Sequence, residues 1–119
     1  MTATPGGDEV AALVERYRLL AEEWDEKQGD AKRANRVFDQ HHEVAKQLRD
    51  IEGGRLGIQA LLTHPVIGVR LLAATDTLRW APEAAVPVLE QIQSVRDLHA
   101  ISAEYTLKAF REGKLNLDW

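Results

Sequence analysis

Two long stripes of apolar residues at helical spacing constrain the fold of this chain most. In the first stripe the apolar positions are Val10, Leu13, Val14, Tyr17, Leu20 and Trp24. The second is lined by Ala34, Val37, Phe38, Ala45, Leu48 and Ile51, with His41 on the same face. A period near 3.6 residues places each set on one face of a helix. Asp8 can cap the first helix, and Gly29 and Asp30 separate it from the second, so the pattern predicts a long helical hairpin.

Prolines and glycines divide the rest of the chain into shorter helices. After Gly53 and Gly54, an apolar segment over residues 56–62 has to stop before Pro65, because the residue preceding a proline avoids helical geometry. Pro65 itself and Pro82 each suit the first turn of a further helix. The pattern predicts four short helices, arranged as two hairpins.

The last two of these helices carry further signals. Pro87 falls in the interior of a helix that begins at Pro82, so we expect that helix to be bent or to start late. Ser94, with Asp97 three residues later, has the form of a capping box and predicts the start of the last helix.

Together these patterns predict one all-α domain of about six helices. The 119 residues are 45% hydrophobic and rich in helix-forming types, which suits helices packed around a single core. The long hairpin is expected over residues 8–52 and the two shorter hairpins over residues 55–112. Residues 1–7 are expected to be flexible, and residues 113–119 to form a tail.

Composition excludes several kinds of site and disfavours several partners. The chain has no cysteine, which rules out disulfides, thiolate metal sites and a thiol nucleophile. Without a secretory signal or an apolar run long enough for a bilayer, a cytoplasmic protein with no membrane contact is expected. The net charge is −4, and residues 1–28 hold seven acids against three bases. Nucleic acid is disfavoured as a partner, since its binders carry a basic excess.

A weak internal repeat of about 30 residues suggests stacked helical hairpins. The segment LLTHPVIGVRLLAATDTL, followed by APEAAVPVLEQI, resembles a HEAT-type repeat, in which a proline turn precedes a helix of pattern V-R-x-x-A-A-x-x-x-L. The matching positions are Pro65, Val69, Arg70, Ala73, Ala74 and Leu78. The resemblance implies a HEAT-like α-α superhelix, in which Arg70 would anchor one repeat to the next.

The segments GDAKRANRVFDQHHEVAKQLRD, HP-x-x-x-VR and AFREGKL resemble a small bacterial family of unknown function with a HEAT-like fold. The similarity covers roughly residues 29–115. Members of that family are similar to immunity proteins, which inhibit the toxin domains that bacteria deliver into competitors. The resemblance therefore implies a protein that occludes the active site of a cognate toxin, and it implies no cofactor.

No constellation in the sequence indicates catalysis or a metal centre. The adjacent His41 and His42 point about 100° apart on a helix and cannot share one ion, and His41 is expected at the edge of the core. Asp39 with His42 makes only half of a helical metal site. Neither a nucleophile elbow nor a glycine-rich phosphate loop occurs. The chain is predicted not to be an enzyme.

Charged and aromatic residues are the candidates for binding a partner protein. The candidates are Glu22, Glu23, Asp25, Glu26, Arg36, Asp39 and Trp80. The acids suit a basic partner, or they form an ordinary solvated helix face. Arg36 and Asp39, with Asn35, are either a recognition patch or a structural group. Trp80 and Trp119 are either exposed anchors or caps on the ends of the core.

Three functions stay open at this stage. The first is neutralisation of a cognate toxin by a monomer or weak homodimer. The second is a general adaptor whose concave side holds another cytosolic protein, as helical solenoids do. The third, a HEAT-like enzyme acting on nucleic acid, would need a basic groove.

Overall fold

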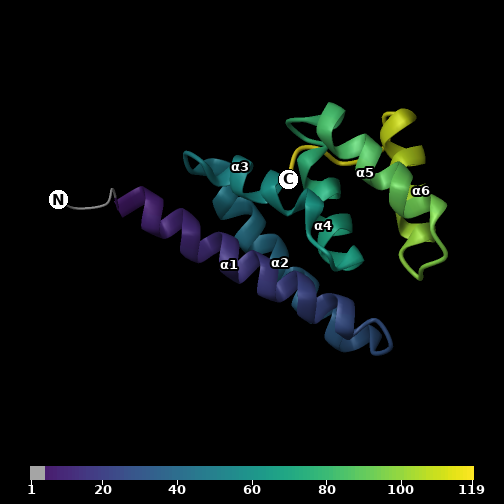
Figure 1. The fold of residues 1–119 in the computed structure, drawn as a ribbon, viewed down its shortest axis with the longest axis horizontal. Helices are drawn as coiled ribbons and strands as arrows, with labels where there is room; N and C mark the ends of the chain where they lie inside the picture. The colour runs from purple at the N-terminus through teal and green to yellow at the C-terminus, as the bar shows by residue number, and fades with distance from the viewer. Residues whose placement is uncertain (1–4) are drawn as a thin grey trace.

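The computed structural model describes residues 5–119, and within this range it contains helices and turns but no strand (Figure 1). The elements are α1 (Pro5–Glu26), α2 (Ala31–Asp50), α3 (Gly54–Gln59), the 3-10 helix η1 (Ala60–Thr63), α4 (Ile67–Thr77), α5 (Pro82–Ser94) and α6 (Ala100–Arg111). The predicted all-α fold of about six helices is confirmed. None of the described helices is both long and apolar enough to cross a membrane.

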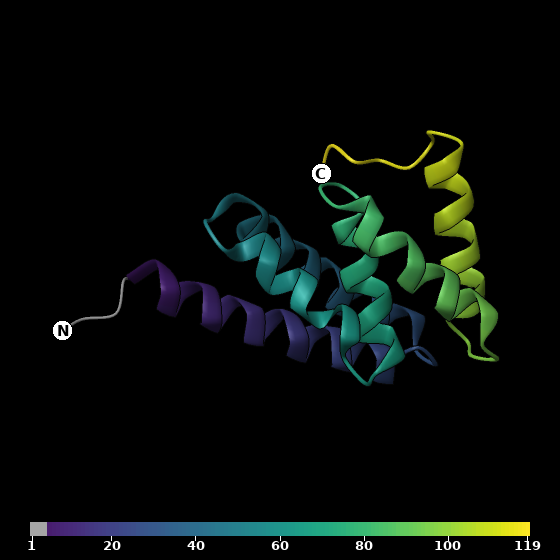
Figure 2. The same ribbon diagram turned by 45° about the horizontal axis from the view of Figure 1, so that its top comes forward.

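Helices α1 and α2 lie side by side as a long hairpin (Figures 1 and 2). The side chain of Asp30 caps α2 by accepting a 3.2 Å hydrogen bond from the main-chain nitrogen of Arg33. The predicted cap at Asp8 is wrong, because α1 already begins at Pro5 and Asp8 lies inside its first turn. Proline suits the first turn of a helix, because a main-chain N–H there has no partner within the helix. Of residues 1–7, expected to be flexible, the first four lie outside the described residues and the others belong to α1.

The connection from α2 to α4 follows the glycine and proline signals. Gly53 has a φ of 84°, in the left-handed region that glycine adopts easily, and turns the chain out of α2. Helix α3 and η1 then continue to Thr63 and stop before Pro65, as predicted. Nδ1 of His64 accepts a 3.1 Å hydrogen bond from the nitrogen of Val66, which orders the turn before α4.

Helix α5 was predicted to be bent or to start late, and the late start is wrong. The helix begins at Pro82 and contains Pro87 in its interior. Pro87 removes the hydrogen bond to the carbonyl of Glu83, four residues earlier. Glu83 is exposed, so water can bond to that carbonyl in place of the missing N–H.

The capping box predicted at Ser94 and Asp97 is also wrong. Ser94 is the last residue of α5, and its hydroxyl donates a 2.7 Å hydrogen bond back to the carbonyl of Gln91. Oδ1 of Asp97 accepts from the nitrogen of His99 at 2.9 Å, within the turn that precedes α6. Both side chains are used by local turn bonds, so α6 starts only at Ala100.

Helix α4 lies at the centre of the core. It packs against α1, α3, η1 and α5, whereas α6 packs chiefly against α5 at the edge of the molecule (Figure 1). The largest fully buried apolar side chains are Tyr17, Leu48, Ile58, Leu78, Leu89, Ile92 and Leu107. They come from α1 to α6, so one core joins the long hairpin to the later helices.

The predicted tail is packed onto this core. After α6 the chain runs back along α5 and ends near the α4–α5 connection (Figures 1 and 2). Leu115, Leu117 and Trp119 are partly buried against the core, and Nε of Arg79 donates a 2.8 Å hydrogen bond to the carbonyl of Leu117. Asn116 and Asp118, which lie between these three residues, are exposed, so the tail presents alternate side chains to the core and to the solvent.

Candidate functional site

A groove of about 220 Å³ lies between α2, α4 and α6, and we call it the α2–α6 groove. Its lining residues are Trp24, Phe38, Leu71, Leu72, Thr75, Ser102 and Thr106. None of them carries a charge. Most of the lining surface is apolar, and the lining side chains carry few polar groups, namely three hydroxyls and the indole N–H of Trp24. This combination of an apolar hollow with a few polar groups is typical of binding sites.

Four helices supply the walls and the floor of the α2–α6 groove, and α1 contributes Trp24. Phe38 of α2 is 42% exposed and its ring stacks on that of His42, with centroids 6.2 Å apart. Ser102 and Thr106 are one turn apart on α6, so both face the groove. The floor comes from α4, where the hydroxyl of Thr75 donates a 2.8 Å hydrogen bond to the carbonyl of Leu71.

A short contact between a carboxylate and a buried imidazole ties α1 to the turn before α6 at one end of the groove. Nε2 of His99 lies 2.6 Å from Oδ1 of Asp25, and His99 is buried. The ring of Trp24 stacks on the imidazole of His99, with centroids 5.1 Å apart and planes inclined by 22°. A Cβ atom at Gly68 of α4 would lie 2.7 Å from Cβ of Asp25. Only glycine, which has no Cβ, allows the side chain of Asp25 to pack this close to α4. The pair thereby holds Trp24 in the wall of the groove.

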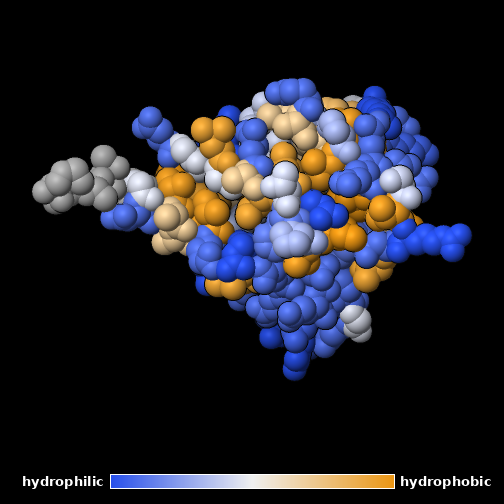
Figure 3. Space-filling model, viewed as in Figure 1, coloured by the Kyte–Doolittle hydropathy of each residue, from blue (hydrophilic) through white to orange (hydrophobic). Residues whose placement is uncertain are grey.

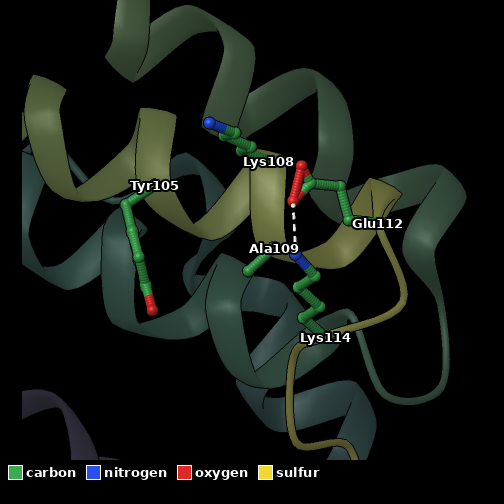
Figure 4. A pocket seen from close by; sticks show the side chains of 5 residues that line it. All are labelled: Tyr105, Lys108, Ala109, Glu112 and Lys114. Carbon is green, nitrogen blue, oxygen red and sulfur yellow. Dashed lines mark ion pairs between the residues drawn. The ribbon is translucent and has the colours of Figure 1, made fainter.

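The outer face of α6 is a second apolar surface. Leu98, Ile101 and Tyr105 are 63%, 77% and 72% exposed, and they follow one another at helical spacing. Beyond Tyr105 lies a shallow hollow of about 230 Å³ with Lys108, Ala109, Glu112 and Lys114 around it (Figure 4). Lys114 and Glu112 form an ion pair of 3.5 Å there. This face therefore changes from apolar to charged along the helix.

The comparisons with known proteins place the chain in a family. The family described as Domain of unknown function (DUF2019) matches residues 8–111. The chain belongs to this family. No curated protein matches the sequence. A similar solved structure is the crystal structure of the protein RPA1889 from Rhodopseudomonas palustris CGA009, with 28% identity and a TM-score of 0.84. The match covers 97% of this chain and 98% of that one.

Three of the predicted binding residues make contacts inside this member of the DUF2019 family. Glu22 pairs with Arg18 and lies 3.5 Å from Nε2 of His64. Asp25 holds His99, as described above. The indole nitrogen of Trp80 donates a 2.9 Å hydrogen bond to Gln59, and the ring is half-buried. These three side chains stabilise contacts between helices.

The other four predicted residues lie on the surface, and two of them line the same hollow. Glu23 and Arg36 line one polar hollow of about 280 Å³ at the α1–α2 interface, together with Lys27, Arg33, Val37 and Gln40. Glu26 lies beside it, and Asp39 and Asn35 are exposed on α2. In Figure 3 this end of the molecule, over the α1–α2 turn, is hydrophilic, whereas hydrophobic patches lie nearer α4.

Two further expectations are changed by the structure. His41 is buried in the core and not at its edge, because its ring packs on Tyr17 with centroids 4.0 Å apart. Arg70 anchors its own turn: its guanidinium donates to the carbonyls of His64 at 2.8 Å and Pro65 at 3.3 Å. Both acceptors belong to the turn that precedes α4, so the predicted bond between repeats is wrong.

Sequence reasoning missed most of the α2–α6 groove. Phe38 and Trp24 belong to the two apolar stripes that predict the core. No motif or periodicity in the sequence points to Thr75, Ser102 or Thr106. Within residues 5–119, no three His, Cys, Asp or Glu side chains are grouped as a metal site requires. The exposed fraction of Phe38 depends on where α6 packs, and the pattern of a single helix does not encode this.

Proposed function

We propose that the chain is a protein-binding domain and not an enzyme, and that its partner binds in the α2–α6 groove. The uncharged, mainly apolar lining of this open groove is the observation that carries the proposal. Protein interfaces have apolar centres that are depleted in charge and surrounded by polar residues. Exposed apolar surface of this kind is otherwise costly to keep in water.

A bacterial toxin domain is the partner we propose first. The resemblance of the sequence to immunity proteins supports it, as does the packing of α4, α5 and α6 each against the next, which suits a HEAT-like array. Glu23 and Glu26 are exposed at the end of α1. Their charge would speed the approach of a basic partner before the groove is engaged.

A general adaptor is the second candidate, and the uncharged groove favours it. An inhibitor of a cation-lined active site would be expected to present acids at its centre, whereas here the acids lie on another part of the surface. Genetics separates the two candidates. Cells that express a toxin encoded beside this gene should survive only with this protein if it is an immunity protein, and should die equally with or without it if it is an adaptor.

Affinity capture with matched variants tests protein binding at the groove. Phe38→Asp places a charge in the groove, and Leu19→Asp places one at an exposed apolar residue of α1 outside it. A partner captured from the native cell should be purified and bound to each variant in turn. We expect binding to be kept by Leu19→Asp and lost by Phe38→Asp. Equal binding by both variants would show that the groove is not the binding site.

A further inference from the structure

The size of the α2–α6 groove sets how much of a partner it can hold. Its volume is about 220 Å³. A closed protein cavity of about 150 Å³ is enough to hold a benzene molecule. One large aromatic side chain therefore fits, whereas a whole helix does not enter.

The lining excludes charged side chains. No lining residue offers a charge to pair with an ion, and transferring an unpaired charge from water into an apolar hollow is strongly unfavourable. The occupant is thus an uncharged side chain with a large apolar body. Trp24 and Phe38 offer aromatic surfaces against which such a ring can pack.

The hydrogen bond of Thr75 adds a chemical requirement. A hydroxyl has one proton to donate and two lone pairs that accept, and the proton of Thr75 is already given to the carbonyl of Leu71 at 2.8 Å. Toward the groove, Oγ1 of Thr75 can therefore only accept. Ser102 is exposed, and the hydroxyl of the half-buried Thr106 can donate or accept, so among the three hydroxyls Thr75 is the one whose bond sets the direction required of an occupant.

We infer that the groove takes one tryptophan or tyrosine side chain of the partner, whose N–H or O–H donates a hydrogen bond to Oγ1 of Thr75. A phenylalanine or leucine would cover that oxygen without bonding to it, which costs affinity. Tryptophan and tyrosine combine a large apolar ring with one donor and often dominate the binding energy of interfaces. This inference rests on the proposed function, since it names the group that the partner places in the groove.

Indole and 1-methylindole test the inference as matched probes. They have the same ring, but methylation removes the N–H donor. Each is titrated into the protein while amide chemical shifts are recorded by NMR. Thr75→Val is the groove variant, and Thr63→Val, at an exposed residue of η1, is its control. We expect saturable shifts around the groove and binding of indole roughly three- to tenfold tighter than 1-methylindole. Thr75→Val should lose this preference, and Thr63→Val should keep it.

The outcomes that overturn the inference are distinct from those that overturn the proposed function. Equal binding of the two probes, or an unchanged preference in Thr75→Val, would remove the donor requirement and leave the groove as an apolar protein-binding site. Failure of both probes to saturate the groove would show that no aromatic side chain is taken there. The proposed function itself fails if a partner binds Phe38→Asp as well as the unmodified protein.

Discussion

The phenol of Tyr17 donates a hydrogen bond of 2.7 Å to Oδ2 of Asp76, which joins α1 to α4 inside the core. The ring of His41 from α2 packs against the same phenol. Burial raises the pKa of Asp76 to about 7, although the bond from Tyr17 opposes the rise. Burial lowers the pKa of His41 to about 3. One buried phenol thus lies between an acid and a base whose pKa values are shifted in opposite directions.

These two shifts have opposite effects on stability in the same pH range. Asp76 has a raised folded pKa, so its contribution favours folding below about pH 4 and is lost as the pH rises through 7. His41 has a lowered folded pKa, so its contribution is present above about pH 6.5 and is lost as the pH falls toward 3. Between about pH 4 and 6.5 the contributions of these two groups to the pH dependence cancel.

Replacing Asp76 by Asn should expose the contribution of His41. Relative to the unmodified protein, the free energy of unfolding of Asp76→Asn is expected to rise between pH 4 and 6.5, by up to about 1.4 kcal/mol per pH unit, the limit for one proton. Asparagine can still accept the hydrogen bond from Tyr17. Urea unfolding at several pH values measures the effect, and a difference between the two proteins that stays constant with pH would contradict it.

Replacing His41 by Leu should have the opposite effect. The variant lacks the imidazole that binds a proton in the unfolded chain below pH 6.5. Relative to the unmodified protein, its free energy of unfolding should therefore fall as the pH rises from 4 to 6.5, again by up to about 1.4 kcal/mol per pH unit. The same urea titrations serve as the measurement. In the double variant with Asp76→Asn, both slopes should vanish. A slope that survives there has its origin in other groups.

Gly68 should not tolerate a methyl group. A Cβ atom there would meet the carboxylate of Asp25, which is held by His99, so Gly68→Ala is expected to cost about 2 kcal/mol of unfolding free energy. Gly29→Ala is the matched control, because no atom lies within 4 Å of a Cβ at that position. Thermal and urea unfolding compare the two. Equal stability of both variants would mean that Asp25 is free to move.

Trp119 should contribute to stability although it lies beyond the last helix. Its ring lies 5.6 Å from the guanidinium carbons of Arg49 and Arg79 and 6.2 Å from the ring of Trp80. Because the ring is only partly buried, Trp119→Ala is expected to cost about 2 kcal/mol, less than a fully buried tryptophan. Asp118→Ala, at an exposed neighbour, is the control and should be close to neutral. Equal loss of stability in both variants would contradict a stabilising role of the Trp119 ring and would indicate that the backbone of the tail is disturbed.

Local patterns in the sequence predicted the helices, but not the groove. The 3.6-residue stripes located α1 and α2, and Asp30, Gly53 and Pro65 fixed turns, because these signals act within a few residues. The caps predicted at Asp8 and Ser94 were wrong, because aspartate and serine also occur in the first or last turn of a helix, as they do here. The α2–α6 groove joins residues from four helices, and its shape depends on how α6 packs on α5. No local signal contains that information.

The partner's footprint on the chain tests the central claim most directly. Hydrogen exchange of the main-chain amides, measured with and without the purified partner, shows which segments the partner covers. We predict slower exchange in the complex around Phe38 in α2, over residues 71–75 of α4 and over residues 102–106 of α6, with little change along the acidic end of α1. Protection confined to residues 15–27, with the groove segments unchanged, would contradict the proposal that this domain binds its partner in the α2–α6 groove.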